Sequence, residues 1–183
     1  MKTCMISFSS RADGNCAAIA DCVQETLGAE GLTRFDFSGL SVHGCGACHC
    51  ECFRQREACP YFADDAFRLN EAAALADRAV FIVPNYCDFP CSNFFLFNER
   101  SHCCFNGHAE LADRYLAVPK KFIVVSNTGR ENFLAAFRDH VLPGTEPDVC
   151  FLRAAAYHRI SLDGDLMNCE PARAAVREFL RDW

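Results

Sequence analysis

The sequence predicts a doubly wound α/β fold, in which helices cover both faces of a parallel sheet. Short apolar runs recur along the chain, and segments with helical spacing of apolar residues alternate with them. Several of the runs are apolar at every position, as expected of parallel strands that are buried on both faces. Five strands that alternate with five helices specify an open parallel sheet.

The apolar runs give the strands, and the spacing i, i+3, i+4, i+7, i+8 gives the helices. The expected strands are 3–9, 33–37, 79–84, 121–126 and 148–156. The expected helices are 19–27, 65–75, one from about Ser92, 133–141 and 172–180. Because crossovers between parallel strands are right-handed, we expect ligands to bind where the carboxyl ends of the strands meet, near the point where strand order reverses.

Composition places the chain among globular proteins and argues against two classes of partner. Its 183 residues are 51% hydrophobic and 23% charged, which fits a single domain over 1–183 with a substantial core. The net charge is −6 and no run of Lys or Arg occurs, so we expect neither a nucleic acid nor a membrane as partner.

The cysteine content requires a separate explanation. The first residues, "MKTCMISFSSRADGN", lack a signal-peptide core, and no apolar stretch approaches the roughly 20 residues of a membrane span. We therefore expect a cytoplasmic protein, in which thiols stay reduced. The 14 cysteines then point to metal binding, redox chemistry or packing. Cys4, Cys22 and Cys150 lie in apolar patterns and are interpreted as core residues.

The loop after the first strand has the chemistry of a phosphate site. Ser9 and Ser10 offer hydroxyls, Arg11 offers a fixed cation, and 13–15 forms a tight turn that opens a helix. The free N–H groups and the dipole at a helix start favour an anion. The loop matches neither the Walker motif nor the G-x-G-x-x-G fingerprint. An ordinary capped turn is the alternative.

Two later loops suit a planar ring. After the third strand, "PNYCDFPCSN" is stiffened by Pro84 and Pro90 and carries the flat side chains of Tyr86 and Phe89. Packing of these aromatic residues on the sheet is the alternative. After the fourth strand, "SNTGREN" offers small polar residues and a glycine over which a ring could lie.

Three motifs in order resemble those of a known family. "SSRADGN", a cysteine loop ending "CPYFADD", and "VPNYCDFPCSNFFLFNER" are similar to the flavodoxin-like NADPH-dependent FMN reductases, above all to their iron–sulfur flavoprotein branch. The resemblance covers roughly the first hundred residues. It implies a flavodoxin-like, five-stranded parallel sheet of order 2-1-3-4-5.

The resemblance also implies which residues hold FMN. The phosphate would be held by Ser9, Arg11, Asn15 and Cys16. The isoalloxazine ring would meet Pro84, Asn85, Tyr86, Cys87 and Asp88 on one side and Asn127, Thr128 and Gly129 on the other. The chain departs from the family pattern at three places. Ser10 replaces a proline, Cys16 replaces a threonine, and Glu99 stands where an aspartate precedes Arg100 in the family. Cys16 is the poorer hydrogen-bond donor.

The cysteine-rich loop at 43–59 has the spacing C-x2-C-x-C-x-C-x6-C. Four thiolates from such a loop can hold a [4Fe–4S] cluster, as in the family's cluster-binding members. The family's third ligand would fall at Glu51, between Cys50 and Cys52, and we choose Cys52 because it leaves the wider turn. The expected ligands are Cys45, Cys48, Cys52 and Cys59. Zinc and a metal-free loop are the alternatives. The vicinal pair Cys103–Cys104 receives no role.

Together these features predict an FMN-dependent oxidoreductase that uses NADH or NADPH. No side chain is assigned a catalytic role, because hydride transfer to a flavin requires positioning of the ring rather than an acid or base. The electrons would pass to a quinone, a flavin or a protein acceptor, through the cluster if it exists. The alternatives are an FMN-binding electron carrier without nicotinamide turnover and a metal-binding module without flavin. The family resemblance also implies a homodimer or homotetramer.

Overall fold

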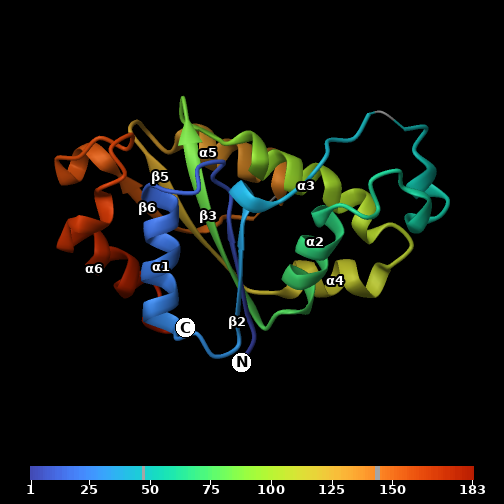
Figure 1. The fold of residues 1–183 in the computed structure, drawn as a ribbon, viewed down its shortest axis with the longest axis horizontal. Coiled ribbons are helices and arrows are strands. Elements are labelled where there is room, and N and C mark those ends of the chain that lie inside the picture. Colours follow the sequence, from blue (N-terminus) through green and yellow to red (C-terminus); the bar gives the residue numbers. More distant parts are fainter. Residues whose placement is uncertain (47, 143–144) are drawn as a thin grey trace.

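A computed structural model describes residues 1–46, 48–142 and 145–183. Its centre is a parallel sheet of order β2-β1-β3-β5-β6 (Figure 1). The strands are β1 (Thr3–Ser7), β2 (Leu32–Asp36), β3 (Arg78–Tyr86), β5 (Lys120–Ser126) and β6 (Asp148–Arg153). The short β4 (Phe89–Pro90) pairs antiparallel with the end of β3. The predicted five-stranded parallel sheet and its flavodoxin-like order are confirmed.

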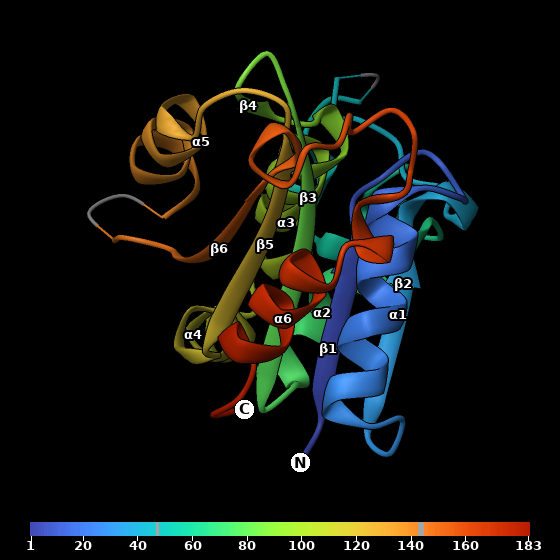
Figure 2. The ribbon, with the colours of Figure 1, turned by 90° about the vertical axis from the view of Figure 1, so that its left-hand side faces the viewer.

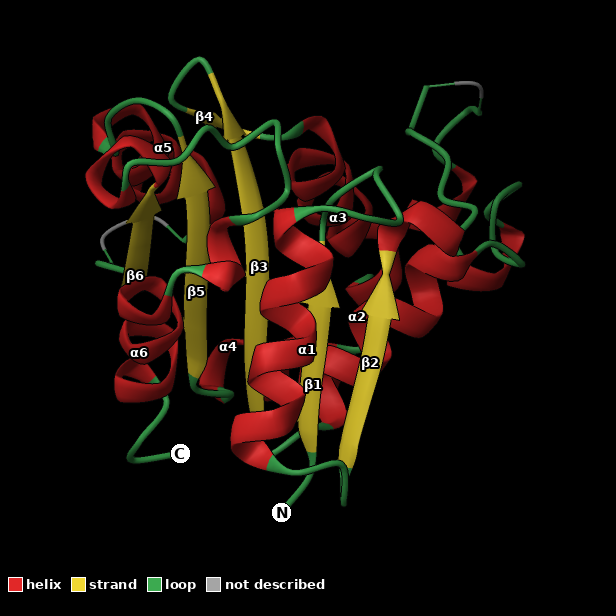
Figure 3. Cartoon of the chain, turned by 60° about the vertical axis from the view of Figure 1, so that its left-hand side comes forward, coloured by secondary structure: helices red, strands yellow, loops and turns green. Residues whose placement is uncertain are grey.

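Helices cover both faces of the sheet, as predicted (Figure 3). On one face lie α1 (Asn15–Leu27) and α6 (Glu170–Phe179). On the other lie α2 (Asp65–Leu75), α3 (Ser92–Phe105), α4 (Ala109–Ala117) and α5 (Glu131–Ala136), the last continued by one π-helical turn, Phe137–Val141. β3 shows why two layers form. Its alternate residues Phe81 and Val83 pack under α3, while Val80 and Ile82 pack under α1 and α6.

The chain adds two elements that the sequence pattern did not predict. Cys87 and Asp88 both have left-handed backbones, with φ of 50° and 67°, and turn the chain from β3 into β4. Such a turn usually carries Asn-Gly, so Cys-Asp gave no hairpin signal. The other addition, α4, has only nine residues, of which Tyr115 alone is fully buried, so it offers only a short apolar pattern.

The carboxyl ends of the five parallel strands meet at one edge, at the top of Figure 2. From β1 the chain crosses to β2 through α1, whereas from β3 it crosses to β5 through α3 and α4 on the opposite face. Strand order therefore reverses between β1 and β3, and a crevice is expected there.

No helix in the described part of the chain is long and apolar enough to cross a membrane.

Candidate functional site

A hollow lies at this reversal point and is lined by loops from four strand ends. Its lining residues are Ser9, Arg11, Asp13, Asn15, Cys16, Pro84, Asn85, Tyr86, Val125, Ser161 and Leu162. Seven of the twelve predicted FMN residues are among them. The structure thus brings together the loop after β1 and the end of β3, which are some seventy residues apart in the sequence.

The start of α1 gives the hollow an anion-binding end. The helix has 13 residues, no side chain that caps its N-terminus, and no acidic residue in its first turn. The nearest carboxylate, that of exposed Asp13, lines the hollow and lies 3.7 Å from Arg11 Nε. Arg11 brings its guanidinium to the same place. Gly14 has a φ of 110°, and a Cβ on it would lie only 3.2 Å from that guanidinium. A helix start beside a guanidinium favours the binding of an anion such as a phosphate group.

Two further polar residues fix the shape of this loop. The hydroxyl of Ser9 accepts a hydrogen bond from the Arg11 backbone N–H at 3.1 Å. From the start of α3, Asn93 Nδ2 donates to the Phe8 carbonyl and to the Ser10 hydroxyl, both at 2.9 Å. Asn93 was not predicted, because no spacing in the sequence links it to the first loop.

Cys16 lines the hollow as a protonated thiol. It is buried, and burial raises the pKa of its thiol to about 12. The side chain also packs in the apolar layer under α1. Cys16 therefore offers an anion only a weak S–H donor.

The end of β3 forms the apolar wall of the hollow. Asn85 is buried, and its Nδ2 donates to the Asp88 carbonyl at 3.1 Å. Its Oδ1 has no hydrogen-bond partner among the described residues. Since a buried acceptor is costly to leave unpaired, this oxygen is suited to an N–H donor on a bound ligand.

Tyr86 stands at the rim with 59% of its surface exposed. Desolvation, with smaller contributions from Cys91 and Cys16, raises the pKa of Tyr86. The hydroxyl therefore stays protonated at neutral pH and is a neutral donor.

The remaining predicted residues lie outside the hollow, in two of the loops that surround it. The Thr128 hydroxyl donates to the Asp88 carboxylate. A Cβ on Gly129 would lie 3.6 Å from the same carboxylate. The loop after β3 and the loop after β5 are thereby tied to each other. Cys87, Asp88, Thr128 and Gly129 do not line the hollow itself.

A segment from the other end of the chain crosses the anion-binding end. We call residues 158–166, between β6 and α6, the strap. Asn15 binds it with both polar atoms, since Nδ2 donates to the Ser161 carbonyl at 2.9 Å and Oδ1 accepts from the Leu166 N–H at 2.9 Å. Arg11 Nη1 donates to the Leu162 carbonyl at 3.2 Å, and Asn127 Oδ1 accepts from the Ser161 N–H at 3.0 Å.

The strap changes the interpretation of two predicted residues. The side chains of Asn15 and Asn127 are anchors for the strap rather than free ligand groups. Arg11 keeps further donors for an anion, because only one of its nitrogens is used by the strap. Ser161 and Leu162 were missed because they lie about 150 residues from the loop they cover and belong to no recognisable motif.

The four predicted metal ligands are not brought together. In the ranges that the structure describes, no group of three or more His, Cys, Asp and Glu side chains is placed to hold a metal ion. Cys45 is exposed and its N–H donates to Glu99 at 2.5 Å, while Cys48 is half-buried. Cys52 and Cys59 are buried against Cys103 and Cys104 of α3.

The local backbone buries some of these cysteines and leaves others exposed. Cys50 has a left-handed φ of 58° and begins the 3₁₀ turn Glu51–Phe53, within which Cys52 is buried. Cys45 stays on the surface beside α3. The arrangement does not fit a [4Fe–4S] cluster or a four-thiolate zinc site, so that part of the sequence-based expectation has no support.

Comparison with solved structures shows which proteins share this fold. The chain is similar to Smu.1420 from Streptococcus mutans, with 14% identity, a TM-score of 0.66, and 97% of this chain and 100% of the other covered. FerB, an NAD(P)H:(acceptor) oxidoreductase flavoenzyme from Paracoccus denitrificans, has 15% identity, a TM-score of 0.57, and 99% and 96% coverage. The azoreductase AzrA has 10% identity, a TM-score of 0.52, and 99% and 98% coverage.

No protein-family model and no curated protein matches the chain. At these identities the structural likeness shows the fold alone, and that fold is flavodoxin-like.

Proposed function

We propose that this chain is an FMN-dependent oxidoreductase that takes hydride from NADH or NADPH and passes the electrons to a small-molecule acceptor. The observation that carries the proposal is the hollow at the reversal point, with an anion-binding end at α1 and an apolar wall at the end of β3. Proteins of the same fold described as an NAD(P)H:(acceptor) oxidoreductase and an azoreductase support it.

The residues of the hollow match the parts of FMN. The phosphate would be held by Arg11, the Ser9 hydroxyl and the first N–H groups of α1. The unpaired Asn85 Oδ1 would accept from the ring, and the protonated Tyr86 hydroxyl would donate. When bound, FMN supplies the chemistry of accepting a hydride and releasing two electrons.

The rim of the hollow suits a second planar molecule. Tyr86 is 59% exposed and Phe89 is 50% exposed, and both belong to the β3–β4 hairpin, which projects beyond the edge of the sheet (Figure 2). Flat apolar side chains of this kind pack against planar rings. We assign this rim to the nicotinamide and to a quinone- or flavin-like acceptor.

The proposal leaves out an iron–sulfur cluster, because the described cysteines are not placed to ligate one. A two-electron acceptor such as a quinone or a flavin would take both electrons from FMN directly.

The test is flavin binding followed by turnover. Purified full-length protein is titrated with FMN by flavin fluorescence, and oxidation of NADH and of NADPH is then followed with a quinone present. We expect saturable binding and steady oxidation of at least one nucleotide. Binding without oxidation of either would favour the electron carrier, and failure to bind FMN would overturn the proposal.

Arg11 provides the matched variants for this test. Arg11→Ala removes the cation at the hollow, and we expect it to weaken FMN binding at least about tenfold, which corresponds to one charge-assisted hydrogen bond. Arg54→Ala removes an exposed arginine on the cysteine loop, distant from the hollow in sequence and absent from its lining, and is expected to bind FMN as the unmodified protein does.

A further inference from the structure

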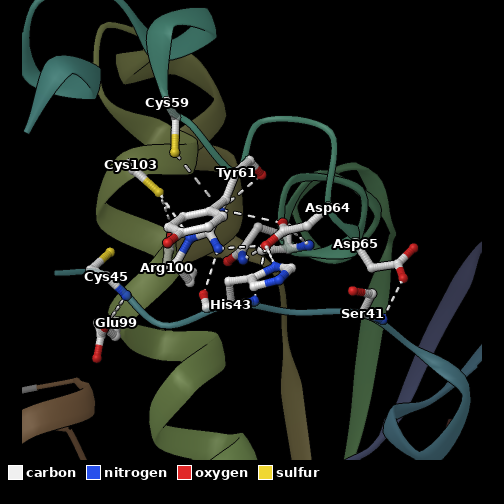
Figure 4. A network of polar contacts seen from close by, with 12 residues as sticks. Ser41, His43, Cys45, Cys59, Tyr61, Asp64, Asp65, Glu99, Arg100 and Cys103 are labelled. Carbon is white, nitrogen blue, oxygen red and sulfur yellow. Dashed lines mark hydrogen bonds and ion pairs between the residues drawn. The ribbon is translucent and has the colours of Figure 1, made fainter. Parts of the chain in front are cut away.

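A second cluster of reactive groups lies away from the hollow, where the cysteine loop meets the end of α3. Arg100 is fully buried there, and its guanidinium donates to two sulfurs: Nε to Cys103 Sγ at 3.4 Å and Nη2 to Cys59 Sγ at 4.0 Å (Figure 4). Cys59 and Cys103 also pack in one buried cluster, together with Cys52, Ala66 and Cys104. One cation thus holds two thiols from distant parts of the sequence side by side.

The cation approaches the two thiols to different degrees. The Arg100 guanidinium lies 3.4 Å from Cys103 Sγ and 4.0 Å from Cys59 Sγ, so its charge favours a thiolate at Cys103 over one at Cys59. While it is protonated, the Cys103 thiol donates a hydrogen bond to the Arg100 carbonyl at 3.1 Å. A thiolate beside a protonated thiol is the usual composition of a redox-active cysteine pair.

We propose that Cys59 and Cys103 form a peroxide-sensitive dithiol site that closes to a disulfide on oxidation. The Cys103 thiolate attacks one oxygen of a hydroperoxide, the O–O bond breaks, and a sulfenic acid and a hydroxide (or alkoxide) result. The Cys59 sulfur then attacks the sulfenic sulfur, its proton leaves with the departing hydroxyl as water, and the S–S bond forms. The two thiols lose two electrons, and the peroxide gains them.

The burial of the two thiols limits the size of the oxidant that can reach them. Cys59 is 8% exposed and Cys103 is 3% exposed, so a small hydroperoxide is suited to reach them and a bulky disulfide is not. The exposed cysteines of the loop, Cys45 and Cys50, have no such guanidinium contact in the described part of the structure.

This site is independent of the proposed flavin chemistry. α3 starts beside the first loop at Ser92, and a rise of 1.5 Å per residue puts Cys103 roughly 16 Å further along the helix. The reaction needs neither FMN nor a nicotinamide. If peroxide forms no such disulfide, the proposed flavin function still stands. If the protein does not bind FMN, the dithiol proposal still stands.

The test uses the full chain, reduced, desalted and exposed to about one equivalent of hydrogen peroxide. Remaining thiols are alkylated, and a non-reducing peptide mass map identifies the disulfides. We expect a Cys59–Cys103 link as the main product, reversed by dithiothreitol. A map in which Cys59 and Cys103 both remain alkylated, or in which Cys103 is linked to another cysteine, would overturn the proposal.

Cys52 supplies the control, because it is as buried as Cys59, at 8%, lies in the same loop, and receives no hydrogen bond from Arg100 in the described structure. Cys52→Ser should still form the Cys59–Cys103 link, whereas Cys59→Ser should lose it. If Cys59→Ser does not fold, the map of the unmodified protein decides the question.

Discussion

At the scale of single residues, Arg100 organises the cysteine loop. It is the largest fully buried side chain in the described structure, and its charge is met by Asp64, with Nη1 and Oδ2 2.6 Å apart. It also donates to the carbonyls of His43 at 2.6 Å and Tyr61 at 3.2 Å (Figure 4). Because each end of the loop is tied to one guanidinium, the loop is held against α3 without a metal ion.

Replacement of Asp64 should therefore be costly. Asp64→Asn keeps an acceptor for the Ala66 N–H, 2.9 Å away, at the start of α2, but leaves Arg100 buried without a counter-ion. We expect a loss of about 3–5 kcal/mol in the free energy of unfolding, measured with urea. The neighbouring Asp65→Asn weakens two contacts at the surface, the ion pair with Arg68 and a hydrogen bond accepted from the Ser41 N–H, and should lose no more than about 1 kcal/mol. Equal losses for the two variants would contradict this account.

At the scale of elements, the strap joins the two ends of the chain across the hollow. Its attachment to α1 depends chiefly on Asn15, which makes two of the hydrogen bonds between them. Gly164 has a φ of 72° and approaches Gly14 closely, since a Cβ on it would lie 3.0 Å from the Gly14 Cα. Only glycine fits this crossing without a shift of the backbone.

Asn15→Ala should release the strap. Loss of both bonds leaves the Ser161 carbonyl and the Leu166 N–H without these partners, at a cost of about 1–3 kcal/mol. We expect faster cleavage within 158–166 during limited proteolysis, mapped by mass spectrometry. Asp163→Ala, at an exposed position of the same strap, should be cleaved at the rate of the unmodified protein. An unchanged rate in Asn15→Ala would show that other contacts hold the strap.

The junction of α4 and β5 gives a pH-dependent prediction. Lys120 donates to the Tyr115 and Val118 carbonyls at the end of α4, and burial lowers the pKa of Lys120 to about 8. In the unfolded chain its pKa is about 10.4, so between pH 8 and 10.4 the unfolded state binds more protons. Below pH 8 the folded state carries the full cost of burying the charged Lys120 ammonium group. The free energy of unfolding should therefore rise as the pH increases from about 8 to about 10.4.

The measurement compares urea unfolding of the unmodified protein and Lys120→Met at several pH values. The difference in unfolding free energy between them should change from pH 8 to pH 10, in the direction that favours the unmodified protein at the higher pH. Lys2→Met is the matched control, because Lys2 is exposed. If the difference in unfolding free energy stayed constant from pH 8 to pH 10, burial of Lys120 would not be lowering its pKa.

At the scale of the whole molecule, a ligand that bridges α1 and the end of β3 should stabilise the folded chain. At a hundredfold excess over its dissociation constant, a ligand adds about 2.7 kcal/mol, which for a chain of this length raises Tm by roughly 5–10 °C. FMN should therefore shift thermal unfolding more than riboflavin, which lacks the phosphate. In Arg11→Ala the FMN shift should fall to that of riboflavin, since Arg11 acts on the phosphate alone. If FMN and riboflavin raised the Tm of the unmodified protein equally, the phosphate would not be bound by Arg11 and the start of α1.

The sequence by itself determined the sheet and the general position of the site. Continuous apolar runs such as β3 must be buried on both faces, so the parallel sheet follows from local pattern. The loop around Arg11 and the end of β3 at Tyr86 each carry their own chemical signal, and parallel strands bring their carboxyl ends to one edge. The strands and these two loops depend only on residues that are close together in the sequence and on the spacing of apolar residues.

Only the tertiary structure decided which partners the polar side chains take. Asn15 meets the strap 146 residues later, and Cys103 meets Cys59 across the boundary of a loop and a helix. No local pattern encodes such contacts, because they arise when packing of the two helical layers fixes where distant loops fall. For the same reason cysteine spacing suggested four metal ligands, while the structure packs Cys52 and Cys59 against Cys103 and Cys104 of α3 and leaves Cys45 exposed.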